Sequence, residues 1–170
     1  MKITTSTVEK FTITDIPGID VIHVFFEDYG PERGKVTIEV CGDAWSYFWG
    51  KTGCETIKDF FKRARTSYLV GKFDIGIRER LDDESGEALE LAAKKFIISE
   101  RRQGNISRYI ARENWNTADT LGDGIMDQSG ELQEIFGDEW YNDLPQKPNP
   151  KYTHLFKIVQ TIQEALKQSV

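Results

Sequence analysis

The 170-residue chain has few of the side chains that build disulfide frameworks or zinc sites, since it contains only two cysteines and two histidines. Cys41 and Cys54 form no Cys-x-x-Cys pair, so a reducing cytosol favours two free thiols, with a disulfide as the alternative. His23 and His154 stand far apart in the sequence, and a four-ligand zinc site would require a long-range convergence. We therefore expect no metal site.

Long apolar runs are also missing. None approaches the roughly 20 residues that span a bilayer, and the opening MKITTSTVEKF has no apolar middle of the kind found in signal peptides. Hydrophobic residues make up 39% of the chain and charged residues 29%, which is typical of globular proteins. We expect one cytoplasmic domain over residues 1–170, without a membrane partner.

The chain has no glycine-rich phosphate loop, nucleophile elbow or dinucleotide fingerprint, so we expect no cofactor. Four acids near strand ends, Glu27, Asp28, Glu39 and Asp43, allow a second interpretation, because clustered carboxylates hold magnesium or act as an acid and base. However, Cys41 stands two residues after Glu39, where a common type of nuclease has lysine. We assign no catalytic residue and interpret these acids as a charged edge that discourages strand pairing.

The segment DTLGDGIMDQSGE, which begins at Asp119, has some features of a calcium loop. Aspartates occupy positions 1, 5 and 9, and a glycine occupies position 6. Two positions depart from the pattern, because Leu121 stands at position 3 and Gly130 stands where the bidentate glutamate belongs. The pattern therefore favours an acidic surface loop over a metal site.

Basic residues are absent between Glu113 and Asp143, where nine aspartates and glutamates occur. The net charge of the whole chain is -6, so the residues outside this tract carry a net charge of +3. This asymmetry creates an electrostatic field that attracts basic partners to the tract. Aromatic residues inside a charged rim concentrate binding energy at many interfaces, although Phe136 and Trp140 could instead fix the tract to a core. The predicted partner-binding residues are Asp123, Asp127, Glu131, Glu134, Asp138, Glu139, Trp140, Tyr141 and Asp143.

Alternating apolar residues over 10–16, 20–28 and from 34 onward predict three strands, and the short glycine- and proline-containing links between them predict antiparallel pairing. In the third strand the apolar phase changes near Gly42. A bulge there would return Trp45, Tyr47 and Trp49 to the face of the preceding valines and isoleucine. We expect this aromatic stripe to fill a core, with a partner-binding or base-stacking surface as the alternative.

Helical periodicity dominates the rest of the chain. We predict a helix over 52–69 with a capping box at Thr52 and Glu55, a helical hairpin around Gly104, and a short helix through Ile135 and Phe136. Asn149 and Pro150 are the expected cap and first residue of a final helix. The predicted fold is α+β, with a small antiparallel three-stranded sheet followed by a packed helix and a mainly helical C-terminal half.

Basic helix faces support an alternative function, a nucleic-acid-binding regulator. The hairpin resembles a helix-turn-helix, with Ser107, Arg108 and Arg112 towards the major groove, but Asn105 and Glu113 occupy positions that are usually apolar. The net negative charge also opposes binding to phosphates. The residues of these faces are Lys58, Lys62, Arg63, Arg65, Arg101, Arg102, Arg108 and Arg112.

Four segments, VEKFTITDIPGID, RGKVTIEVCGDAWSYFWGKTG, TIKDFF and EIFGDEWYNDLPQKPNP, resemble a family of small proteins encoded in the accessory regions of lambda-like bacterial prophages. The W-x-x-x-W-G and I-F-G-D-E-W runs carry most of this resemblance. It implies a phage context in the cytoplasm of a bacterial host and transfers no catalytic residue. Together with the charge pattern, it predicts a non-catalytic accessory protein that binds a host macromolecule, with a host protein as the expected partner. Its acidic surface would either contact a basic protein or occupy a nucleic-acid site and so act as an inhibitor.

Overall fold

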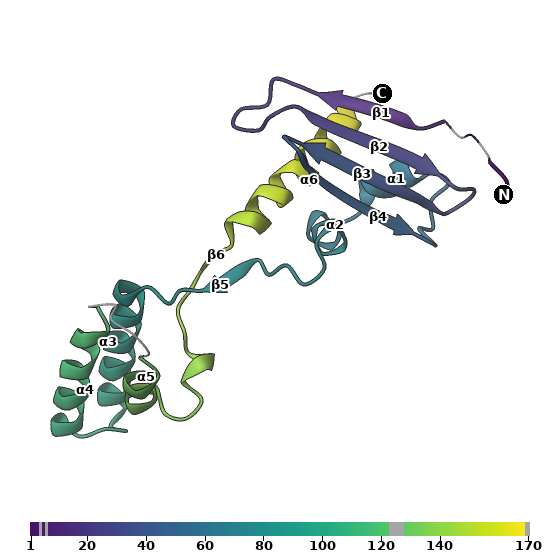
Figure 1. Cartoon of the computed structure of the whole chain (residues 1–170). Coiled ribbons are helices and arrows are strands. Elements are labelled where there is room, and N and C mark those ends of the chain that lie inside the picture. Colours follow the sequence, from purple (N-terminus) through teal and green to yellow (C-terminus); the bar gives the residue numbers. More distant parts are fainter. Residues whose placement is uncertain (4, 6, 123–127, 169–170) are drawn as a thin grey trace. The chain divides into compact units, whose positions relative to one another are not determined.

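The computed structural model describes residues 1–3, 5, 7–122 and 128–168, and the chain divides into two compact units (Figure 1). Unit 1 consists of Met1–Glu79 together with Asn149–Val170, and unit 2 consists of Arg80–Pro148. Unit 2 is therefore an insertion in the sequence of unit 1. The predicted α+β class is confirmed, whereas the prediction of one domain over residues 1–170 stays a prediction.

A four-stranded antiparallel sheet forms one layer of unit 1 (Figure 1). Its strands follow chain order: β1 (Glu9–Ile13), β2 (Ile22–Asp28), β3 (Gly34–Val40) and β4 (Asp43–Trp49). The prediction of three strands was wrong because its third strand is a hairpin. Val40 pairs with Asp43, and the two residues between them, Cys41 and Gly42, have φ angles of 51° and 93°. Positive φ at both positions is the geometry of a tight type I′ turn.

This hairpin, and not a bulge, places the aromatic stripe on the core face. Val36 pairs with Tyr47 and Ile38 pairs with Trp45, and residues that are paired across two strands share a face. Trp49 is buried, while Trp45 and Tyr47 are half-buried and pack against the same core. The expectation that the stripe fills a core is confirmed.

Three helices cover that face of the sheet: α1 (Ile57–Arg63), α2 (Thr66–Phe73) and α6 (Pro150–Gln168) (Figure 1). The predicted helix over 52–69 is thus divided in two, and the helical segment begins at Ile57 and ends at Phe73. Its predicted capping box was wrong, because the hydroxyl of Thr56, not of Thr52, accepts the backbone N–H of Asp59.

The buried amide of Gln163 on α6 stabilises the break between α1 and α2. Its Nε2 donates to the carbonyl oxygens of Phe61 (2.8 Å) and Ala64 (2.7 Å), and its Oε1 accepts the hydroxyl of Thr66 (2.8 Å). The carbonyls at the end of α1 have no partner within the helix, so this single side chain satisfies groups that would otherwise be buried without hydrogen bonds.

Unit 2 is mainly helical. It contains α3 (Gly86–Gln103), α4 (Arg108–Leu121), α5 (Ser129–Phe136), the short 3₁₀ helix η1 (Trp140–Asn142), and a two-stranded ladder of β5 (Arg80–Asp82) with β6 (Gln146–Pro148). The predicted helical hairpin is confirmed: Gly104 ends α3 with φ of 81°, and the hydroxyl of Ser107 caps α4 by accepting the N–H of Ile110. The core of unit 2 consists of Leu89, Ala93, Ile97, Ala118, Leu121, Leu132 and Ile135.

Asn149 joins the two parts of unit 1 where the chain returns from unit 2. Its backbone N–H donates to the carbonyl of Glu79 (2.9 Å), and its side-chain amide donates to the carbonyl of Arg78 (2.7 Å). Its Oδ1 also accepts the N–H of Lys151, which confirms the predicted cap of α6. None of the described helices combines the length and the apolar composition needed to cross a membrane.

Candidate partner-binding surface

The predicted acidic surface lies on α5, on η1 and on the residues between and after them. Glu134, Asp138, Glu139, Tyr141 and Asp143 are exposed, whereas Glu131 and Trp140 are half-buried. Asp123 and Asp127 lie outside the residues that the structure describes. The sequence contains no basic residue between Arg112 and Lys147, so these acids are not interrupted by positive charge. The described part of the surface is therefore negative along its length.

Its aromatic residues are divided between the core and the surface. Phe136 packs against Phe96, with 4.9 Å between ring centroids, and Trp140 packs against the core of unit 2. Tyr141 is 57% exposed and lies beside the Trp140 ring. The interpretation that Phe136 and Trp140 fix the tract to the core is confirmed, and Tyr141 remains as an aromatic side chain available to a partner.

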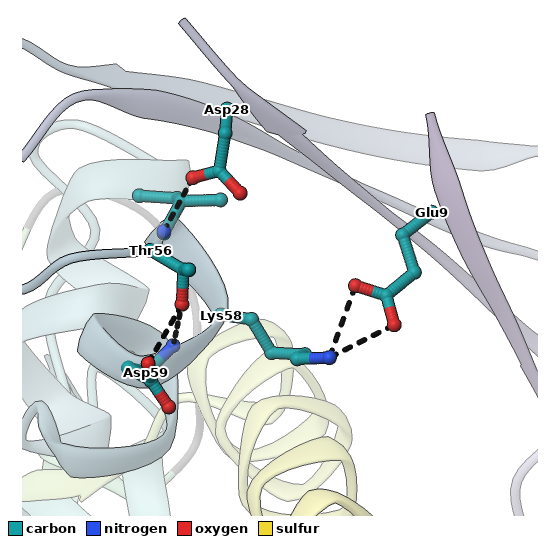
Figure 2. A network of polar contacts seen from close by, with 6 residues as sticks. Glu9, Asp28, Thr56, Lys58 and Asp59 are labelled. Carbon is teal, nitrogen blue, oxygen red and sulfur yellow. Dashed lines mark hydrogen bonds and ion pairs between the residues drawn. The ribbon is translucent and has the colours of Figure 1, made fainter. Parts of the chain in front are cut away.

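Two of the four strand acids that suggested a nuclease, Glu27 and Asp28, have partners within unit 1. The interpretation of the four acids as a charged edge was wrong for those of β2 and β3, because these are the inner strands of the sheet. Asp28 accepts the backbone N–H of Ile57 (2.7 Å) at the start of α1, as Figure 2 shows. Glu27 pairs with Lys35 (3.3 Å) and accepts the hydroxyl of Tyr29, and this hydrogen bond raises the pKa of Tyr29. Among residues 1–3, 5, 7–122 and 128–168, no group of three or more histidines, cysteines or acids is placed to hold a metal ion. The predicted acidic loop from Asp119 lies partly outside those ranges.

The basic residues of the alternative function are divided between the two units. Those of unit 1 lie on α1 and at Arg65, directly before α2, whereas those of unit 2 lie on the α3–α4 hairpin. In unit 1, Lys58 is paired with Glu9 (2.8 Å), which ties α1 to β1 (Figure 2). The charge of Lys58 is therefore paired within unit 1. In unit 2, Arg101, Arg102 and Arg112 line one hollow on the hairpin.

Two other hollows flank the turn between β3 and β4 in unit 1. Asp74, Lys151 and His154 help to line the first, of about 360 Å³, and Asp20, His23 and Cys41 help to line the second, of about 480 Å³. Cys41 and Cys54 are free thiols, as expected. The hydrogen bond between Cys41 and Asp20 raises the pKa of the thiol. Because only the thiolate is strongly nucleophilic, this environment does not activate Cys41 for covalent catalysis.

A protein-family model described as a phage family matches residues 1–168 of the chain. No curated protein and no solved structure matches it. The family match therefore supplies the biological context, while the geometry must supply the site.

Proposed function

Because the chain belongs to this phage protein family, we propose that it is a non-catalytic accessory protein that binds a host protein through the acidic surface of unit 2. The observation that carries this proposal is the exposure of four carboxylates, Glu134, Asp138, Glu139 and Asp143, in a tract without basic side chains. The interaction takes place in the cytoplasm of the bacterial host, where binding would inhibit the partner.

The exposed charges are uncompensated within the described part of the chain. None of these four carboxylates takes part in an ion pair there, and Asp138 accepts one neutral hydrogen bond, from the Gln133 amide (2.7 Å). Unpaired surface charge of one sign accelerates association with a partner of the opposite sign and opposes association with nucleic acid. A basic protein surface is thus the partner that fits this tract, with Tyr141 as its aromatic contact.

The experiment is an affinity capture from a lysate of the bacterial host, repeated after nuclease digestion, followed by mass spectrometry of the bound proteins. For a partner identified in this way, the double variant Asp138→Lys/Glu139→Lys should reduce the affinity about tenfold at low salt, with a weaker salt dependence, because it reverses charges that steer association. A partner that disappears after nuclease digestion would instead indicate the nucleic-acid-binding regulator.

The matched control is Glu39→Lys/Glu55→Lys, which makes the same change in net charge at two exposed positions of unit 1. This control should retain the affinity of the unmodified protein. Equal affinities of the unmodified protein and Asp138→Lys/Glu139→Lys at two salt concentrations would rule out the acidic surface as the contact.

A further inference from the structure

A hollow of about 500 Å³ lies on the outer surface of the α3–α4 hairpin, entirely within unit 2. Its lining combines apolar side chains with three arginines. The residues that line it are Ile97, Ile98, Arg101 and Arg102 of α3 and Ala111, Arg112, Trp115 and Asn116 of α4. Neither the family match nor the acidic surface accounts for this combination.

Only some of the apolar side chains that line the hollow are buried in the core of unit 2. Ile97 is buried, but Ile98 and Trp115 are 39% and 37% exposed. Ile97 belongs to the core of unit 2, and Ala111 packs against that core, whereas Ile98 and Trp115 are not part of it. The hairpin therefore has a second apolar face, and such a face is typical of a site that binds a partner.

The two ends of this face differ in charge. At one end Lys94 is paired with Glu90 and Asp119, and its ammonium lies 5.2 Å from the centroid of the Trp115 ring. At the other end, no ion pair neutralises Arg101, Arg102 or Arg112 within the part of the chain that the structure describes. Arg101 and Arg102 lie in the last turn of α3, where the helix dipole stabilises positive charge. Arg112 is inside α4, so its charge does not stabilise a helix end.

We propose that this face binds an acidic amphipathic helix of a host protein. Large apolar side chains of that helix would occupy the hollow against Ile98 and Trp115, and aspartates or glutamates one turn away would pair with the arginines. Guanidinium groups form bidentate hydrogen bonds with carboxylates, and a helix that binds in a groove presents apolar anchors at helical spacing. The apolar lining favours this occupant over nucleic acid, since a phosphate backbone offers nothing that would bury Ile98.

This inference is independent of the acidic surface, because it concerns a different face of unit 2 and a partner of the opposite charge. The two proposals can fail separately: Asp138→Lys/Glu139→Lys changes only the acidic surface, and Arg112→Glu changes only the hollow. Arg108 stands four residues before Arg112, on the same side of α4, and extends the basic end of this face.

The test is the selection of a yeast-displayed library of peptides of about 16 residues, which is four to five helical turns, against the full-length protein. We expect enriched peptides to combine Asp or Glu with large apolar residues at helical spacing. Their affinity should fall at least about tenfold for Arg112→Glu and for Ile98→Asp, because each removes one of the two kinds of contact. Arg112→Lys, which keeps the charge but not the bidentate geometry, should retain part of the affinity.

Lys51→Glu is the matched control, since it makes the same charge change at an exposed residue of unit 1 that does not line the hollow. It should leave the affinity unchanged, and thermal unfolding should show that every variant is folded. The proposal is overturned if no acidic peptide is enriched, or if the enriched peptides bind Arg112→Glu and Ile98→Asp as tightly as the unmodified protein. A labelled DNA oligonucleotide whose binding is lost in Arg112→Glu, without any peptide binding, would assign the face to nucleic acid instead.

Discussion

Unit 1 and unit 2 differ in the size of their buried apolar cores. In the described residues, the core of unit 1 contains 17 buried hydrophobic residues from the sheet and three helices, whereas that of unit 2 contains seven. The hairpin of unit 2 also exposes a group of large apolar side chains: Leu91, Ile98, Tyr109, Ile110 and Trp115. A unit that leaves apolar surface exposed on regular helices is better suited to binding than to supporting a fold. We infer that unit 1 is the scaffold and that unit 2 presents the contact surfaces.

The largest expected effect is the loss of a core ring from unit 1. Phe61 is fully buried and lies between Phe26 and Phe73, at centroid distances of 5.6 and 6.2 Å. Phe61→Ala should lower the free energy of unfolding of unit 1 by about 3–5 kcal/mol, because it removes the ring and leaves a cavity. Urea unfolding measures this effect.

The tryptophans allow the unfolding of unit 1 to be followed alone. Trp45 and Trp49 belong to unit 1, so their fluorescence reports on it once Trp115 and Trp140 of unit 2 are replaced by phenylalanine. Tyr109→Ala in unit 2 is the control. Because Tyr109 is 72% exposed, its substitution should change the free energy of unfolding of unit 1 by less than about 0.5 kcal/mol. Similar losses for Phe61→Ala and Tyr109→Ala would contradict the difference between the two units.

Much of unit 1 follows from local sequence patterns. Alternation predicted β1, β2 and β3, and the Asn149-Pro150 pair predicted the start of α6. The hairpin of β3 and β4 was missed because Cys41 at positive φ is unusual for a non-glycine residue, so the two-residue turn resembled a continuous strand. The break between α1 and α2 depends on Gln163, which is about 100 positions away in the chain and therefore invisible to local periodicity.

The acidic surface and the hollow on the hairpin also differ in how far local sequence patterns predict them. The acidic tract was predictable because its carboxylates lie within one short stretch of sequence that contains no basic residue. The hollow on the hairpin was not predicted as such, since it requires Ile98 and Arg101 of one helix to meet Trp115 and Arg112 of another. Its signal was present in the helical spacing of apolar and basic residues on both helices, but the basic residues were interpreted as the faces of a nucleic-acid-binding regulator.

A smaller effect is expected from the pH dependence of unit 2. Hydrogen bonds from Lys147 and then from Ser85 hold the pKa of Asp83 below its ordinary value. A lowered pKa in the folded state stabilises the protein above the unfolded-state value of about 4, and this stabilisation is lost as the pH falls through the folded-state pKa. Asp83→Asn should therefore lower the Tm of unit 2 at neutral pH, and the difference should disappear in acid. A difference that persists in acid would show that a property of the substituted amide other than its missing charge is responsible.

The smallest effect on unit 1 should follow the largest change in sequence, the replacement of residues 80–148 by a short glycine-serine linker. The N–H of Asn149 donates to the carbonyl of Glu79, so the two ends of unit 1 are one hydrogen bond apart and a short loop can join them. Because the excised segment has its own core, its removal should change the free energy of unfolding of unit 1 by less than about 1 kcal/mol. Fluorescence of Trp45 and Trp49 during urea unfolding measures this value. If the shortened chain is unfolded, unit 1 depends on unit 2, and the whole chain behaves as the one domain that its length predicted.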